Sequence, residues 1–86
     1  MRKVRWEKDA FQEMEEWKYN SPQIFRRIGD LIADTKINPF HGIGKPEPLK
    51  HHLKGCWSRR INKEHRLIYR ITNDAIHIIS CKGHYD

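Results

Sequence analysis

CWSRRINKEHRLIYRITNDAIHIISC, residues 56–81, is the stretch that decides the fold. Within residues 66–71, arginine, isoleucine and arginine alternate with leucine, tyrosine and isoleucine, which is the period of a strand with two different faces. Strands are expected at residues 56–61, 65–71 and 75–81, and the polar residues between these segments are typical of tight turns. Because strands joined by short turns pair antiparallel, this stretch predicts the antiparallel part of a sheet.

The preceding sequence predicts one strand and two helices. Residues 2–6, RKVRW, alternate basic and apolar side chains, as a short strand does. Helical spacing begins at Asp9, with Phe11 and Met14 as its first apolar positions, and breaks at YNSP. Ser21 is suited to cap a second helix that has Pro22 in its first turn. This second helix ends at Asn38, before a proline. Its apolar stripe comprises Ile24, Phe25, Ile28, Leu31 and Ile32.

The order of these elements predicts the fold class. Residues 39–48, PFHGIGKPEP, contain two glycines and three prolines, so we expect an ordered loop without a regular element. The 86 residues suffice for one core, and the whole chain, 1–86, is expected to be a single domain. The expected architecture is α+β, with two N-terminal helices packed on one face of a twisted, mainly antiparallel sheet.

The net charge of +6 is concentrated in one part of the chain. Residues 1–38 have a balance of +1, whereas residues 45–70 have a balance of +6. A cluster of cations in a domain of pI 9.6 indicates a polyanionic partner, nucleic acid first and an acidic protein second. No apolar run suits a membrane span or a signal peptide, so a cytoplasmic location is expected.

The cysteines and histidines do not follow a metal-binding pattern. Cys56 and Cys81 are far apart in sequence, and two buried, reduced thiols are expected, although neighbouring strands could bring them together. The six histidines lack ligand spacing, and the GIGK segment lacks the spacing and lead-in strand of a nucleotide-binding loop. Neither a metal nor a cofactor is therefore expected.

Three residue types in this chain suit the cleavage of RNA without a metal. The reaction needs a base for the 2′-hydroxyl, a fixed cation for the phosphate and an acid for the leaving 5′-oxygen. Glu47 is a candidate base, Arg66 a candidate cation and His84 a candidate acid. Each also has an ordinary interpretation: a solvated loop carboxylate, an arginine paired with a surface carboxylate, and a disordered terminal histidine.

Substrate contacts are expected on the face of the sheet away from the helices. Either Arg59 or Arg60 should lie there with Arg66 and Arg70, depending on the strand register. Tyr85 is suited to stack on a base, although an aromatic residue near a chain end is as often a packing residue.

One long segment resembles a known family. NPFHGIGKPEPLKHHLKGCWSRRINKEHRLIYRI, residues 38–71, is similar to the core motif of YoeB toxins of the RelE superfamily, and CKGHYD resembles their C-terminal His-Tyr. The resemblance implies a microbial ribonuclease-like fold and a toxin that cleaves messenger RNA in the ribosomal A site. It also implies a cognate antitoxin of the YefM type, whose acidic segment would cover the basic surface.

The resemblance also implies residue roles. Glu47 matches the general base, His84 the general acid, and Arg66 the arginine that stabilises the phosphate. The matching substrate contacts are Lys50, Arg60 and Tyr85. The chain departs from the family pattern in the additional Asp86 and in Lys82-Gly83, where the glycine is expected to give the chain end more freedom.

Two other functions use the same residues. A module that binds RNA or the ribosome without cutting would need the same basic surface. A DNA-binding repressor is disfavoured because the cations lie mostly on expected strands and not on a helix. A homodimer through Trp17 and Phe40, which are expected to be exposed apolar residues, is a further possibility.

Overall fold

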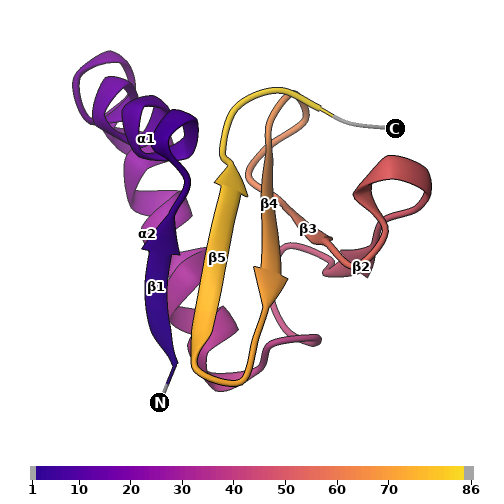
Figure 1. Ribbon diagram of the computed structural model, residues 1–86. Coiled ribbons are helices and arrows are strands. Elements are labelled where there is room, and N and C mark those ends of the chain that lie inside the picture. Colours follow the sequence, from indigo (N-terminus) through magenta and orange to yellow (C-terminus); the bar gives the residue numbers. More distant parts are fainter. Residues whose placement is uncertain (1, 85–86) are drawn as a thin grey trace.

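The computed structural model describes residues 2–84 and contains one five-stranded sheet with two helices. In chain order the elements are β1 (Lys3–Trp6), α1 (Lys8–Asn20), α2 (Pro22–Ile37), β2 (Glu47–Pro48), the 3-10 turn η1 (His51–Leu53), β3 (Trp57–Arg60), β4 (Arg66–Ile71) and β5 (Ala75–Ser80). The strands lie in the order β1-β5-β4-β3-β2, and only the β1–β5 pair is parallel. Both helices lie on the same side of the sheet (Figure 1). The expected fold class is confirmed.

The second helix begins and packs as its sequence indicates. The Ser21 hydroxyl accepts a hydrogen bond from the Ile24 N–H at 3.4 Å, and Pro22 occupies the first turn, where its missing N–H costs nothing. Ile28 and Leu31 are fully buried. Thr35, one turn beyond Leu31, is buried as well, and its hydroxyl donates to the Leu31 carbonyl at 2.7 Å, so this polar group is satisfied inside the helix.

The core lies between the helices and one face of the sheet. It comprises Ala10, Ile28, Leu31, Ile32, Ile61, Leu67, Tyr69, Ile76, Ile78 and Cys81. Leu67 and Tyr69 point into it from β4, so the intervening residues Arg66, Ile68 and Arg70 belong to the opposite face. The strand alternation therefore separates the apolar core from the face expected to hold RNA.

Two details differ from the sequence-based expectations. Residues 39–48 are not entirely irregular, because Glu47–Pro48 forms β2 and pairs with β3 at the edge of the sheet. Proline is tolerated there because an edge strand does not need every N–H for pairing. In α1, Phe11 is exposed although its spacing favoured burial, and the fully buried residue on that helix is Ala10.

Candidate active site

The strand register brings Glu47, Arg60 and Arg66 to one face of the sheet. Glu47 on β2 is paired with Ser58 on β3, and Arg60, two residues further along β3, is paired with Arg66 on β4. Directly paired residues share a face, and residues two apart on a strand point the same way. Glu47 and Arg60 are therefore diagonal neighbours, and the face is the one opposite the helices. Both side chains are exposed.

Arg60 and Arg66 form a like-charge pair across adjacent strands. Like charges directly opposite each other destabilise a sheet unless an anion lies between them. Among residues 2–84 no carboxylate forms an ion pair with either guanidinium. The Nη1 of Arg66 donates to the carbonyls of Asn62 at 2.7 Å, His65 at 3.2 Å and Lys63 at 3.3 Å, all in or next to the β3–β4 turn. Within the described chain its Nε and Nη2 make no such bond, so they keep donors for a phosphate.

Arg59 is not part of this cationic face, which resolves the alternative between Arg59 and Arg60. Its side chain is fully buried on the helix side of the sheet, with Nη1 2.6 Å from Asp34 Oδ2 on α2. This guanidinium hydrogen bond is the main reason why the pKa of Asp34 lies below its ordinary value, and a second bond from the Ile43 N–H acts in the same direction. One of the cations counted in residues 45–70 is thus neutralised internally.

The remaining donors of Arg59 hold the segment that precedes β2. Nη2 donates to the carbonyls of Asn38 at 2.5 Å and His41 at 2.8 Å, and Nη1 also donates to Ile43 at 3.2 Å. Nε donates to the Tyr69 hydroxyl, which donates in turn to the Pro39 carbonyl. Every buried side-chain polar atom described has a partner. The loop that carries Glu47 is consequently fixed to α2, β3 and β4.

Gly83 is fixed beside Arg66 at the start of β4. The Arg66 N–H donates to the Gly83 carbonyl at 2.9 Å, and the Gly83 N–H donates to Nδ1 of His65, also at 2.9 Å. Gly83 has a φ of +87°, a conformation that glycine adopts without strain. The N–H and the carbonyl of Gly83 are both hydrogen-bonded, so Gly83 forms a defined turn. From the sequence, this glycine was expected to give the chain more freedom. His84 follows directly and is exposed.

Helix α1 holds the residues just before this turn. Glu13 Oε1 accepts from the Cys81 N–H at 2.8 Å, and the indole N–H of Trp17 donates to the Cys81 carbonyl at 2.9 Å. The Trp17 ring meets the His65 ring edge-on, with their centroids 4.8 Å apart. In Figure 1 the last described residues run from the end of β5 across the end of the sheet where β4 begins. We call residues 81–83 with these three side chains the C-terminal clasp.

The clasp was not predicted from the sequence, and Trp17 differs from its predicted environment. Trp17 is partly buried against the core and hydrogen-bonded, so the expectation that it is exposed is wrong. Phe40 is exposed, with its ring 4.8 Å from that of Trp57. The helical and strand periods show which side chains face the core. They do not show that Glu13, Trp17 and His65 bind the main chain of residues 81–83.

The other expected site residues lie around this face or outside the described chain. Lys50 is exposed and precedes η1, two residues beyond β2. Tyr85 and Asp86 lie outside the described residues.

Cys56 and Cys81 are both free and buried, and burial is the main cause that raises the pKa of the Cys81 thiol to about 12.

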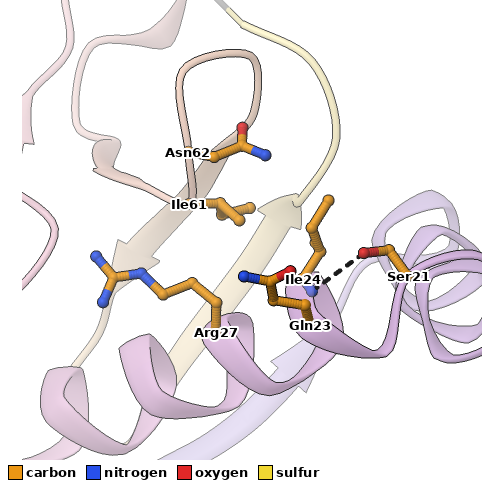
Figure 2. A pocket seen from close by; sticks show the side chains of 6 residues that line it. All are labelled: Ser21, Gln23, Ile24, Arg27, Ile61 and Asn62. Carbon is orange, nitrogen blue, oxygen red and sulfur yellow. Dashed lines mark hydrogen bonds between the residues drawn. The ribbon is translucent and has the colours of Figure 1, made fainter.

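One pocket of the described chain has a volume of about 310 Å³. Figure 2 shows it between the start of α2 and the β3–β4 turn. It is lined by Ser21, Gln23, Ile24, Arg27, Ile61 and Asn62. This lining offers no acid, base or nucleophile suited to RNA cleavage, so we do not place the reaction there.

Within residues 2–84 no three His, Cys, Asp or Glu side chains gather in a metal-binding arrangement, and no helix is long and apolar enough to cross a bilayer.

Comparison with known proteins identifies the family. Residues 6–85 match the model of the YoeB-like toxin of bacterial type II toxin–antitoxin systems. The chain belongs to the YoeB-like toxin family. It is 46% identical over 83 residues to Toxin YoeB of Escherichia coli K12, covering 96% of this chain and 99% of that toxin.

Solved structures of YoeB-like toxins share the whole fold. The YoeB dimer from Staphylococcus aureus matches with a TM-score of 0.92 and 39% identity, covering 98% of both chains. The heterotetrameric YoeB–YefM complex from the same organism matches with a TM-score of 0.91 and 38% identity, covering 99% of both chains. The described chain therefore has the complete YoeB-like fold.

Proposed function

We propose that this chain is a metal-independent endoribonuclease that cleaves messenger RNA in the ribosomal A site and so inhibits translation. The observation that carries the proposal is the facing pair Arg60 and Arg66, on a sheet face shared with Glu47. Within residues 2–84 neither guanidinium forms an ion pair with a carboxylate. Two guanidinium groups facing each other, with a carboxylate on the neighbouring strand, suit a phosphodiester whose 2′-hydroxyl must lose a proton. The family membership supports the same conclusion.

The proposed mechanism assigns one step to each group. Glu47 takes the proton from the 2′-hydroxyl, which attacks the adjacent phosphorus. Arg66 stabilises the negative charge on the phosphate oxygens as it develops. His84, carrying a proton, donates it to the leaving 5′-oxygen. The products are a 5′-hydroxyl end and a 2′,3′-cyclic phosphate, which water then opens to a 3′-phosphate. Lys50, Arg60 and Tyr85 contact the substrate on either side of this bond.

The test is primer extension on a reporter message translated in vitro. Wild-type protein should produce discrete cuts within codons, and His84→Ala should cut about 10²–10⁴ times more slowly because the leaving group lacks its acid. His41→Ala is the matched control, since the His41 side chain is exposed and only its carbonyl is used by Arg59. A folded His84→Ala protein that cuts at the wild-type rate would refute the role of His84.

The second candidate function is a module that blocks ribosomes without cutting. It uses the same Arg60–Arg66 pair, so the product ends decide between the two. A 5′-hydroxyl and a cyclic or 3′-phosphate on the fragments support the nuclease. Translation arrest with intact messages would establish the blocking module and remove the catalytic roles.

The proposed partner is a YefM-like antitoxin in the cytoplasm. The Staphylococcus aureus relatives are a YoeB dimer and a heterotetrameric complex of YoeB with YefM. For this chain, an acidic segment of the antitoxin would lie over the cationic face and exclude RNA. Light scattering of the purified chain, alone and with its antitoxin, should give a homodimer and a larger complex. A monomer that the antitoxin does not bind would contradict both assignments.

A further inference from the structure

The C-terminal clasp contains a histidine outside the proposed catalytic set. His65 comes immediately before Arg66 at the start of β4 and is partly buried. Its Nδ1 accepts the Gly83 N–H at 2.9 Å, so the ring carries its proton on Nε2 when this bond is made. Because Nδ1 of His65 accepts a hydrogen bond from a main-chain amide, it has no proton to donate to a substrate. Its effect is on the path of the main chain at Gly83.

The hydrogen bonds of residues 65 and 66 fix two successive peptide groups. The His65 ring holds the peptide N–H of Gly83, and the Arg66 N–H holds the carbonyl of Gly83, whose carbon is bonded to the His84 nitrogen. Fixing both groups determines the direction in which the main chain enters His84. Without the His65 bond, one of the two restraints on this turn is lost, and the Gly83 N–H has no other protein partner within residues 2–84.

The other side of the clasp holds the His65 ring in place. Trp17 contacts it edge-on and donates its own N–H to the Cys81 carbonyl. The same tryptophan thus orients the acceptor and anchors the chain two residues before Gly83. An aromatic contact of this kind restricts the rotamers of both rings.

We propose that His65 is a positioning residue, whose Nδ1 fixes the Gly83 turn so that His84 meets the leaving 5′-oxygen. This inference rests on the proposed function, because it gives His84 the role of the acid. A group displaced by about 1 Å from its productive position can lose about 10²-fold in rate, so a hydrogen bond that sets the main-chain direction has a measurable effect on the chemical step. RNA affinity depends on Arg60 and Lys50 and should not change.

The experiment compares two variants that separate the hydrogen bond from the ring. His65→Phe keeps an aromatic ring against Trp17 but removes the acceptor. His65→Asn removes the ring but places an amide oxygen near the position of Nδ1. The measurements are the single-turnover rate of cleavage on programmed ribosomes, the affinity for a message with 2′-methoxy groups, which cannot be cut, and the exchange rate of the Gly83 amide hydrogen by NMR.

We expect His65→Phe to cut about 10–10²-fold more slowly with unchanged affinity and faster exchange at Gly83. His65→Asn should recover most of the rate and the protection. Equal rates for His65→Phe and wild type would overturn the inference while leaving the proposed function intact. A slow His65→Asn and a fast His65→Phe would assign His65 to ring packing and would also overturn it. No cutting by wild type would overturn the proposed function and this inference together.

Discussion

Arg59 Nη1 lies 2.6 Å from Asp34 Oδ2, and this ion pair joins β3 to α2 with the arginine fully buried. A buried arginine is costly to desolvate, and it is retained where several hydrogen bonds compensate it. Arg59 satisfies this requirement with carbonyls of the 38–43 loop and with the Tyr69 hydroxyl. The pair therefore connects the core to the loop that leads to Glu47.

Replacing Arg59 should destabilise the fold far more than replacing its neighbour. Arg59→Met leaves Asp34 and the loop carbonyls without their donor, so we expect the free energy of unfolding to fall by about 3–5 kcal/mol. Arg60→Met, at an exposed position one residue along the same strand, should change it by at most about 0.5 kcal/mol. Urea unfolding followed by circular dichroism measures both. Similar losses in the two variants would contradict the role given to Arg59.

The ion pair should also make stability depend on pH in the acidic range. The pKa of Asp34 is lowered in the folded state from its ordinary value of 3.8, chiefly by the Arg59 hydrogen bond. The unfolded chain therefore takes up a proton first as the pH falls. The contribution of Asp34 is complete above the unfolded value and is lost as the pH falls through the folded one.

An Asp34→Asn variant isolates this contribution, because asparagine does not titrate. We expect the variant to be less stable than wild type near neutral pH and the difference to shrink between about pH 5 and pH 2. The check is a series of urea unfolding curves at several pH values. A difference that stays constant over this range would mean that the Asp34 carboxylate is not stabilised by folding.

The local periodicity was sufficient to predict most of the fold. The alternation in residues 65–71 and the capped stripe of α2 each correspond to an observed element, because each has an apolar face that packs into the core. The β2 strand was missed because two residues with a proline have no period of their own. Its pairing depends on β3, the next strand along the chain, and not on a pattern within β2 itself.

The site was predictable only in part, because its geometry arises from register and from side-chain to main-chain bonds. A single strand pattern does not determine which of Arg59 and Arg60 faces the core. In the structure the buried side chain is that of Arg59, which pairs with the partly buried Asp34. The bonds from His65 and Trp17 to the chain end join residues 18 and 64 positions apart, and no local spacing encodes them. The assignments of Glu47, Arg66 and His84 came from the family motif and stay predictions.

The buried thiols should be unreactive in the native protein. Burial raises the pKa of Cys81 to about 12, with Glu13 acting in the same direction, so almost no thiolate is present at neutral pH. In a Cys56→Ser variant, iodoacetamide at pH 8 should label Cys81 only after urea is added, as measured by mass spectrometry. Labelling in native buffer at the rate of a free cysteine would show that Cys81 is accessible.

Gly44 is expected to be essential for the approach to β2. Its φ of +80° disfavours other residues, and a Cβ there would lie 2.7 Å from Leu31 Cδ2 and 3.2 Å from the Arg60 carbonyl. Its own carbonyl accepts the Arg60 N–H at 2.6 Å, so a shift at Gly44 would move the strand pairing next to Glu47. The left-handed conformation alone costs an alanine about 1–2 kcal/mol, and the collision adds to this cost.

Gly29 provides the matched control, because the same substitution has the opposite expected sign there. It lies within α2, and a Cβ would meet no atom within 4 Å. Gly29→Ala should therefore raise the free energy of unfolding by about 0.5–1 kcal/mol, since glycine is a poor helix former. Gly44→Ala should lower it and slow RNA cleavage more than Gly29→Ala does. Urea unfolding and single-turnover cleavage of both variants test this, and a Gly44→Ala protein with wild-type stability and rate would show that the loop tolerates a side chain at this position.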